Sequence, residues 1–193
     1  MKIPRILAFA GSTRTDSFNK NLVRIAAGAA RASGVETTMV DLKDYPLPLF
    51  DEDLEAGQGM PENAAKLKEL FVSHDGLLIA SPEYNSSISG VLKNVIDWVS
   101  RGPKGEAPLL AFSGKSAAIL SASPGALGGL RGLVHLRSIL ANLNVIVLPE
   151  QTAVGSAYDQ FDADGNLKDS RQLEKVQAIG KRLAAFVKKH HAA

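Results

Sequence analysis

Short apolar segments alternate along the chain with stretches whose apolar residues recur at helical spacing. The apolar segments have the length of strands and few polar interruptions, a pattern typical of a parallel sheet covered on both faces. They occupy residues 3–10, 35–41, 76–80, 116–121 and 144–148. The pattern therefore predicts five strands, each followed by a helix.

Amphipathic stretches fill the intervals between these segments. The stretch after the third segment shows this best, because its apolar residues recur at spacings of one and four and so share one helical face. These residues are Val91, Leu92, Val95, Ile96 and Val99. Helices are expected at about residues 19–32, 61–73, 91–99, 127–143 and 173–187.

The alternation of strands and helices predicts one α/β domain over residues 1–193, with a doubly wound five-stranded parallel sheet in strand order 2-1-3-4-5. In such sheets, ligands bind beyond the carboxyl ends of the strands, near the point between strands one and three. The loops expected there are residues 11–19, 81–89 and 121–129. Any site should be built from these three loops.

Composition narrows the chemistry that such a site can perform. The chain has no cysteine, which removes disulfides, thiolate catalysis and cysteine-ligated metal. A net charge of +2 gives no strong field for nucleic acid. No apolar run approaches the length of a membrane helix, and the first residues do not resemble a signal peptide. We therefore expect a cytoplasmic protein with neither a membrane nor a nucleic-acid partner.

The first loop is rich in hydroxyl groups and carries one arginine, Arg14. Because it leads into a helix, backbone N–H groups and the positive end of the helix dipole face it as well. The loop lacks the glycines of a dinucleotide fingerprint. The pattern favours a terminal phosphate monoester, and an ordinary hydroxyl-rich turn is the alternative.

The second and third loops offer groups suited to a flat heterocycle. Tyr84 provides a planar face, and the Asn85 amide can pair with a polar ring edge. In the third loop, Ser123 can hydrogen-bond to such an edge, and Gly125 permits close backbone approach. Taken singly, each loop could equally be a capped start of a helix.

Two motifs together resemble a known family. The first is Gly-Ser-x-Arg-x-x-Ser-x-Asn at residues 11–19, and the second is Pro-Glu-Tyr-Asn-x-Ser-x-x-Gly-x-Leu-Lys-Asn-x-x-Asp-Trp at residues 82–98. In type, order and spacing they resemble the NADPH-dependent FMN reductase family, which has a flavodoxin-like fold and includes bacterial quinone and chromate reductases. The resemblance covers nearly the whole chain.

The resemblance implies FMN as cofactor and NAD(P)H as co-substrate. It assigns the FMN phosphate to Ser12, Arg14, Ser17, Phe18 and Asn19. It assigns the ribityl chain and isoalloxazine to Pro82, Glu83, Tyr84 and Asn85, with Ser123 and Gly125 approaching the flavin from the third loop. It implies hydride transfer to FMN and onward reduction of a quinone, free flavin, chromate or an azo compound. Because the cofactor carries this chemistry, no catalytic acid or base and no metal ligand is predicted.

Two other classes are compatible with the topology. A flavodoxin-type electron carrier would bind FMN without oxidising NAD(P)H, but such carriers are strongly acidic and this chain is not. A phosphate-handling domain would need a cysteine in the first loop, as in small phosphatases, or an aspartate after the third strand, as in receiver domains. The chain has Ala80, Ser81 and Pro82 at the latter place.

Several features outside the loops suggest contacts. The resemblance and the apolar residues 47–50 indicate a homodimer or homotetramer. Trp98 is expected either at a subunit interface, which is favoured, or beside a neighbouring loop. The acidic residues 51–55 are predicted to form a solvated loop. Arg101 and Lys104 either lie in a solvent loop or receive an anionic group of the nicotinamide cofactor or the acceptor.

Overall fold

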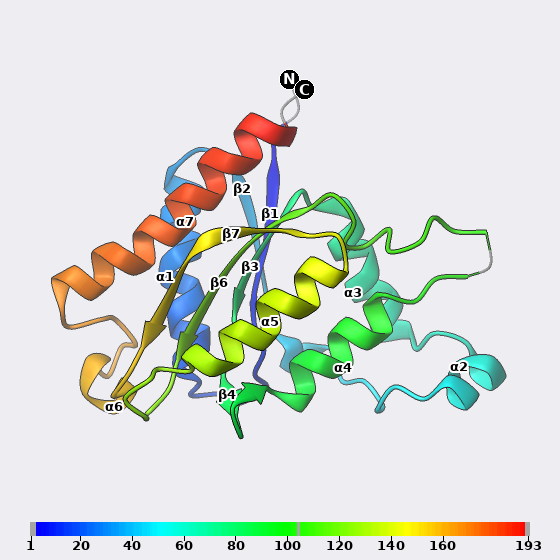
Figure 1. The fold of residues 1–193 in the computed structure, drawn as a ribbon, viewed down its shortest axis with the longest axis horizontal. Coiled ribbons are helices and arrows are strands. Elements are labelled where there is room, and N and C mark those ends of the chain that lie inside the picture. Colours follow the sequence, from blue (N-terminus) through cyan, green and yellow to red (C-terminus); the bar gives the residue numbers. More distant parts are fainter. Residues whose placement is uncertain (1–2, 104, 192–193) are drawn as a thin grey trace.

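A parallel sheet forms the centre of the protein, seen in a computed structural model that describes residues 3–103 and 105–191 (Figure 1). Its strands are β1 (Arg5–Ala10), β2 (Glu36–Val40), β3 (Gly76–Ala80), β6 (Ser116–Ala122) and β7 (Ile146–Val154). They are all parallel and lie in the order β2-β1-β3-β6-β7. This order confirms the predicted flavodoxin-like doubly wound sheet.

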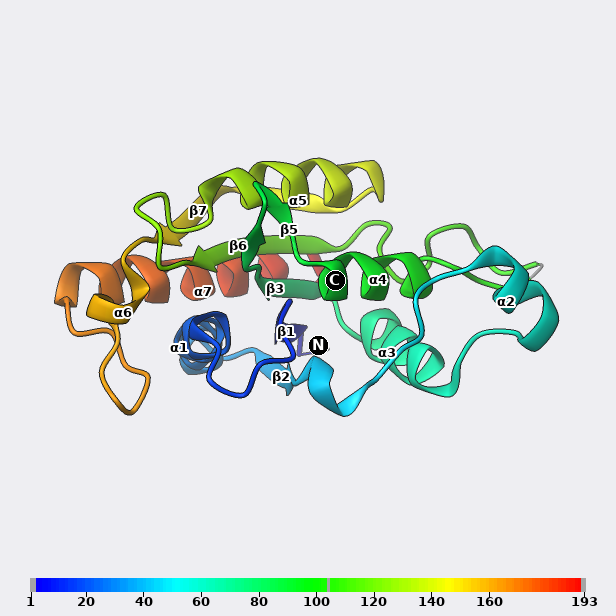
Figure 2. The same ribbon diagram turned by 90° about the horizontal axis from the view of Figure 1, so that it is seen from below.

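Helices cover both faces of the sheet. One face carries α1 (Phe18–Ala32) and α7 (Ser170–His191), and the other carries α3 (Glu62–Ser73), α4 (Gly90–Val99) and α5 (Leu130–Asn142), as Figure 2 shows from the carboxyl edge of the strands. Strand β1 explains the apolar runs, because Ile6 and Ala8 enter the first core whereas Leu7 and Phe9 enter the second. A strand buried on both sides needs no polar alternation.

The last strand differs most from the prediction. It was expected at residues 144–148, yet β7 begins at Ile146 and continues to Val154. Its second half pairs with β6 after a register shift between Ala117 and Ile119. As the outer strand of the sheet, β7 accommodates the polar residues Glu150, Gln151 and Thr152, which had interrupted the apolar pattern.

The prediction of a solvated acidic loop was wrong, because residues Glu52–Gln58 form the helix α2. The side chain of Asp51 caps this helix by accepting hydrogen bonds from the N–H groups of Asp53 and Leu54. Acidic residues in its first turn also suit the helix dipole. None of its residues is buried, so no apolar periodicity marked it.

Three further short elements were not predicted. They are the turns η1 (Leu42–Asp44) and α6 (Ala157–Gln160), and a hairpin of β4 (Glu83–Tyr84) with β5 (Ser87–Ile88). The two residues at the hairpin tip, Asn85 and Ser86, have φ values of 50° and 65°. This left-handed backbone fits the tight turns that join adjacent antiparallel strands.

Of the two positions considered for Trp98, the structure shows the one beside a neighbouring loop and not the favoured interface. Its side chain is fully buried, its Nε1 donates to the carbonyl oxygen of Pro48 at 2.9 Å, and Phe50 packs edge-on against its ring. The apolar segment 46–50 of the same chain therefore covers it. None of the helices in the described parts of the chain has both the length and the apolar character needed to cross a membrane.

Candidate functional site

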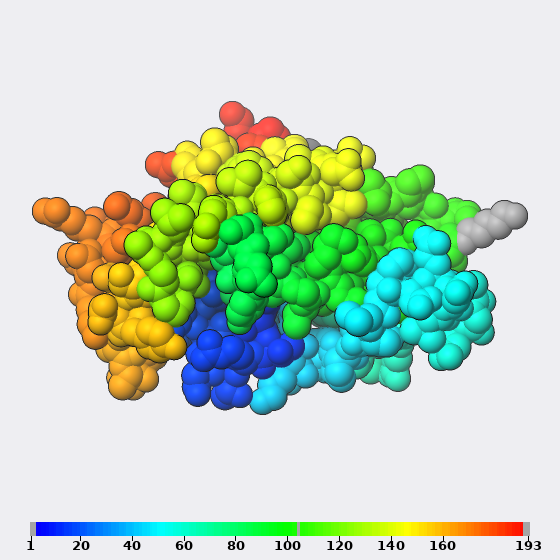
Figure 3. Space-filling view, turned by 60° about the horizontal axis from the view of Figure 1, so that its bottom comes forward, coloured from blue at the N-terminus to red at the C-terminus, as the bar shows by residue number. Residues whose placement is uncertain are grey.

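The three predicted loops meet at the carboxyl edge of the sheet. Ala10, Ala80 and Leu120 are level with one another in the strand register, so the loops that follow them start side by side. Figure 3 shows this end of the molecule, with the first loop in blue beside the green hairpin and the yellow-green third loop. The edge therefore carries one composite site, as the topology predicts.

A pocket of ≈ 160 Å³ lies between these loops. It is lined by Ser12, Arg14, Ser17, Phe18, Asn19, Pro82, Glu83, Tyr84, Ala122, Ser123 and Pro124. Of the residues singled out from sequence, Asn85 and Gly125 do not line it, and both are exposed nearby on their loops. Ala122 and Pro124 were not singled out.

One end of the pocket is suited to an anion. Helix α1 begins there after Ser17, whose buried hydroxyl makes no capping hydrogen bond. The Arg14 guanidinium is exposed and forms no ion pair or hydrogen bond within the described residues. Uncapped N–H groups, hydroxyls and a guanidinium without a partner in the described residues are together the donors that suit a phosphate group.

Two predicted residues of the first loop have side chains engaged elsewhere. The Asn19 amide donates to the carbonyl oxygen of Ala122 and accepts from its N–H group, both at 2.9 Å. The Phe18 ring packs against the rings of Tyr158 and Phe161. These side chains join α1 to its surroundings, which leaves their backbone N–H groups as the part able to face an anion.

Lys43 is a cation of this region that the sequence did not reveal. Its Nζ donates to Thr15 Oγ1 in the first loop at 3.2 Å. Lys43 lies in η1, directly after β2, and β2 neighbours β1 in the sheet. The only signal available beforehand was that all strands end at the same edge.

The Glu83 carboxylate is bonded to the start of α5. It is paired with Arg131 and accepts a hydrogen bond from the N–H group of Gly132. Burial raises the pKa of Glu83, but the bonds from Gly132 and Arg131 outweigh that effect and hold its pKa below the usual value. The carboxylate is therefore ionised at neutral pH. Tyr84, next along the hairpin, is 55% exposed at the mouth of the pocket.

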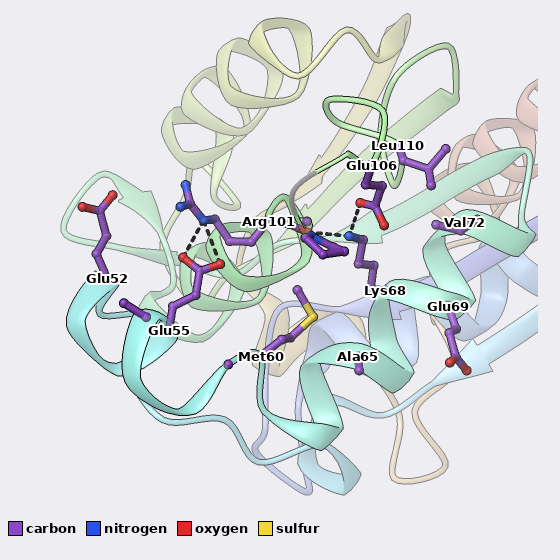
Figure 4. Close-up of a pocket in the computed structure, with 14 residues that line it drawn as sticks. Glu52, Glu55, Met60, Ala65, Lys68, Glu69, Val72, Arg101, Glu106 and Leu110 are labelled. Atoms are coloured by element: carbon purple, nitrogen blue, oxygen red, sulfur yellow. Dashed lines mark hydrogen bonds and ion pairs between the residues drawn. The ribbon is translucent and has the colours of Figure 1, made fainter.

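A larger cavity of ≈ 970 Å³ lies away from the three loops, between α2, α3 and the segment after α4 (Figure 4). Both cations labelled in Figure 4 are already paired: Arg101 with Glu55, and Lys68 with Glu106. Glu52 and Glu69 add further negative charge to its lining. It therefore offers no receptive site for a phosphate, and the anion-receiving role considered for Arg101 has no support here. Lys104 lies outside the described residues.

The residues at the carboxyl edge fit FMN. Arg14 and the start of α1 supply donors for a phosphate, and the exposed Tyr84 supplies a flat face at the mouth. Because ≈ 160 Å³ is less than the 300–1,000 Å³ of typical ligand pockets, the enclosed part suits the phosphate end, with the ring at the mouth.

This sheet order, with an anion loop after β1 and an open edge after β3, defines the class of flavodoxin-like proteins. Within that class, the sequence pattern of NADPH-dependent FMN reductases matches residues 4–159, and the chain belongs to this family.

Relatives and a solved structure agree with this assignment. An NAD(P)H-dependent FMN reductase of Pseudomonas aeruginosa is 39% identical, over 96% of each chain. A 2-hydroxy-1,4-benzoquinone reductase of Burkholderia is 38% identical, over 95% of this chain and 96% of the other. The structure of a flavoenzyme NAD(P)H:(acceptor) oxidoreductase from Paracoccus denitrificans superposes with a TM-score of 0.81 at 28% identity, over 97% of this chain and 99% of the other.

Proposed function

We propose that this chain is an NAD(P)H-dependent FMN reductase that delivers electrons to quinones, and also to free flavin, chromate or azo compounds. The observation that carries the proposal is Arg14, which has no partner in the described residues, beside the uncapped start of α1 and within the residues that match the family, 4–159. The chemistry that bound FMN supplies is hydride acceptance from nicotinamide and electron release to an acceptor.

The chain's own residues bind and orient the cofactor. In the proposed site, the hydroxyls of Ser12 and Ser17, the Arg14 guanidinium and the N–H groups of Phe18 and Asn19 hold the phosphate. The ribityl chain and ring are assigned to Pro82, Glu83, Tyr84, Asn85, Ser123 and Gly125. No acid or base of the protein is needed, so we assign no catalytic residue.

Exposed apolar side chains on the third loop, the start of α5 and the hairpin favour a flat apolar acceptor. Leu127 and Leu130, on and just after the third loop, are 52% and 42% exposed, and Tyr84 is exposed on the hairpin. Apolar side chains around an open ring face suit stacking of a quinone. The Burkholderia relative, a benzoquinone reductase, supports the same class of acceptor.

Anaerobic spectroscopy of the purified protein tests the proposal. The protein should be yellow, or become yellow with added FMN, and the flavin absorbance should bleach when NADPH or NADH is added. Free FMN with the same nucleotide provides the control. A yellow protein that neither nucleotide bleaches would instead be an electron carrier of the flavodoxin type, and a protein that binds no flavin would exclude both functions.

Assembly and compartment complete the proposal. We expect a homodimer or homotetramer in the cytoplasm. The feature that supports association is Leu49, which is 80% exposed although its neighbour Phe50 packs on Trp98.

A further inference from the structure

The hairpin β4–β5 is attached to α5 by polar contacts. Glu83 Oε1 accepts from Arg131 Nε at 3.1 Å and from Nη2 at 2.9 Å, while Oε2 accepts from the N–H group of Gly132 at 2.9 Å. A second contact joins Ser87 Oγ to His135 Nδ1 at 2.9 Å. The Glu83 side chain is only 8% exposed, so water competes little for its oxygens.

Helix α5 has no cap of its own. The residue before it is Gly129, which has no side chain to accept a hydrogen bond, and the first turn contains no acidic residue. The carboxylate of Glu83, which belongs to the hairpin, acts as the cap instead. It accepts a hydrogen bond from the N–H group of Gly132 in the first turn. A carboxylate at a helix N-terminus also interacts favourably with the helix dipole.

Glu83 can cap α5 because two glycines let the start of this helix lie close to β6 and the hairpin. A Cβ atom on Gly129 would lie 1.9 Å from Ser121 Oγ, and one on Gly132 would lie 3.2 Å from the carbonyl oxygen of Ser87. The start of α5 is therefore in contact with both β6 and the hairpin. The part of the third loop that follows β6, residues 123–129, runs directly into this start.

We infer that Glu83 is a positioning residue, whose carboxylate caps α5 and thereby fixes the hairpin and the third loop, the two sides of the flavin-ring subsite, relative to each other. This inference rests on the proposed function and deepens it. It gives Glu83 a role through α5 in addition to its place in the lining of the pocket. The phosphate end of the site, built by the first loop and α1, does not depend on this contact.

Binding of FMN and riboflavin to the full-length protein tests the inference, because riboflavin has the ring but no phosphate. Glu83→Gln keeps the size of the side chain but loses the charge, and should raise the Kd for both ligands by the same factor, about tenfold. The visible circular dichroism of the bound flavin should change with it, since that signal reports the surroundings of the ring.

Arg131→Gln is the second variant, because Arg131 is 59% exposed and its loss threatens the fold less. It should produce a smaller effect of the same kind, with less than additive loss in the double variant. Glu150→Gln is the matched control, since Glu150 pairs with Arg182 between β7 and α7 and should leave both Kd values unchanged.

Three results would overturn the inference. One is Glu83→Gln protein that binds both ligands as the wild type does, with the same circular dichroism. Another is a loss of affinity for FMN alone, which would place Glu83 at the phosphate. The third is a lower melting temperature of Glu83→Gln protein with unaltered flavin binding, which would show that the contact of Glu83 with α5 serves stability alone. If the wild type itself binds no flavin, the proposed function fails as well.

Discussion

Arg14 extends from the first loop beside the start of α1, and the described residues provide no acidic partner for it. Replacing it with alanine removes a charged fork that matches a phosphate. We expect Arg14→Ala to raise the Kd for FMN by about 10- to 100-fold, because a hydrogen bond to a charged group is worth about 1.5–3 kcal/mol. Affinity for riboflavin should not change.

Fluorescence titration of the apoprotein with each flavin measures these affinities. Arg31→Ala is the control, because Arg31 lies in the last turn of the same helix and donates to Thr37 in β2. Full FMN occupancy in Arg14→Ala protein would contradict the phosphate assignment.

His74 makes stability depend on pH. Its ring is buried at the end of α3, where it contacts Thr38 Oγ1 and the carbonyl oxygen of Leu70. Burial is the largest effect and lowers its pKa. The hydrogen bond to the Leu70 carbonyl oxygen opposes this, the charges of Arg5 and Lys115 lower the pKa further, and Asp75 raises it least, so that the pKa is lowered overall. The folded protein therefore binds this proton less readily than the unfolded chain does.

Because the unfolded state gains the proton first, the free energy of unfolding should fall as pH drops below about 6.5. Urea unfolding between pH 7.5 and 5 measures this slope. His74→Gln should reduce it, whereas His190→Gln, at an exposed position of α7, should not. An identical slope in wild type and His74→Gln would refute the assignment to His74.

Sequence patterns located the residues of the pocket well but not the direction of their side chains. Hydroxyls and an arginine before a helix identify an anion loop because the chemistry is local. The engagement of Asn19 with Ala122 and of Glu83 with α5 depends on partners 103 and 49 residues away. Lys43 was missed for the same reason, since only the strand order brings it to Thr15.

At the scale of elements, α1 and α7 are in unusually close contact. A Cβ atom on Gly180 in α7 would lie 1.9 Å from the carbonyl oxygen of Ala26 in α1. Gly180→Ala should therefore lower the free energy of unfolding by about 1–3 kcal/mol, because the helices must move apart.

Gly28→Ala provides the opposite case on α1. No atom lies within 4 Å of a Cβ at that position, so the better helix propensity of alanine should stabilise the protein by up to about 1 kcal/mol. Urea unfolding measures both variants. Equal changes in the two would show that helix propensity, and not the contact with Ala26, decides the effect.

The elements that were predicted correctly are those with a buried apolar stripe. The helices α1, α3, α4, α5 and α7 each place apolar residues in one of the two cores, and the five parallel strands place them in one or both. Helix α2 and the hairpin bury too little to show periodicity, and the second half of β7 is polar because it lies at the edge of the sheet. Their formation depends on capping, turn conformation and neighbouring strands.

On the surface of the whole molecule, the side chain of Leu49 is exposed. The rest of its segment, residues 46–50, packs on α4. Asn94 and Trp98 both donate to the carbonyl oxygen of Pro48, yet the side chain of Leu49 is 80% exposed. If copies of the chain associate through this segment, Leu49→Asp should weaken association by about tenfold or more, since it places a charge in an apolar contact.

Sedimentation over a range of protein concentrations measures that change. Met39→Asp, an exposed apolar position on β2, is the control. The melting temperature of dilute protein should be the same for the wild type, Leu49→Asp and Met39→Asp, because neither substitution touches the core. Unaltered sedimentation of Leu49→Asp protein would remove this segment as a contact between subunits.

The capping of α5 by Glu83 also makes the two ends of the site electrostatically different. The three loops lead into α1, α4 and α5, and side chains of the chain already accept hydrogen bonds from N–H groups in the first turns of two of them: Ser89 in α4 and Glu83 in α5. Among these three helices, α1 is the one that starts without a side-chain cap, so a ligand with one charged end and one flat end has a single orientation in which to bind. Glu83 would then help to orient the ligand, because its carboxylate excludes a phosphate from the start of α5. The reversed orientation, with the ring over α1, is thereby disfavoured.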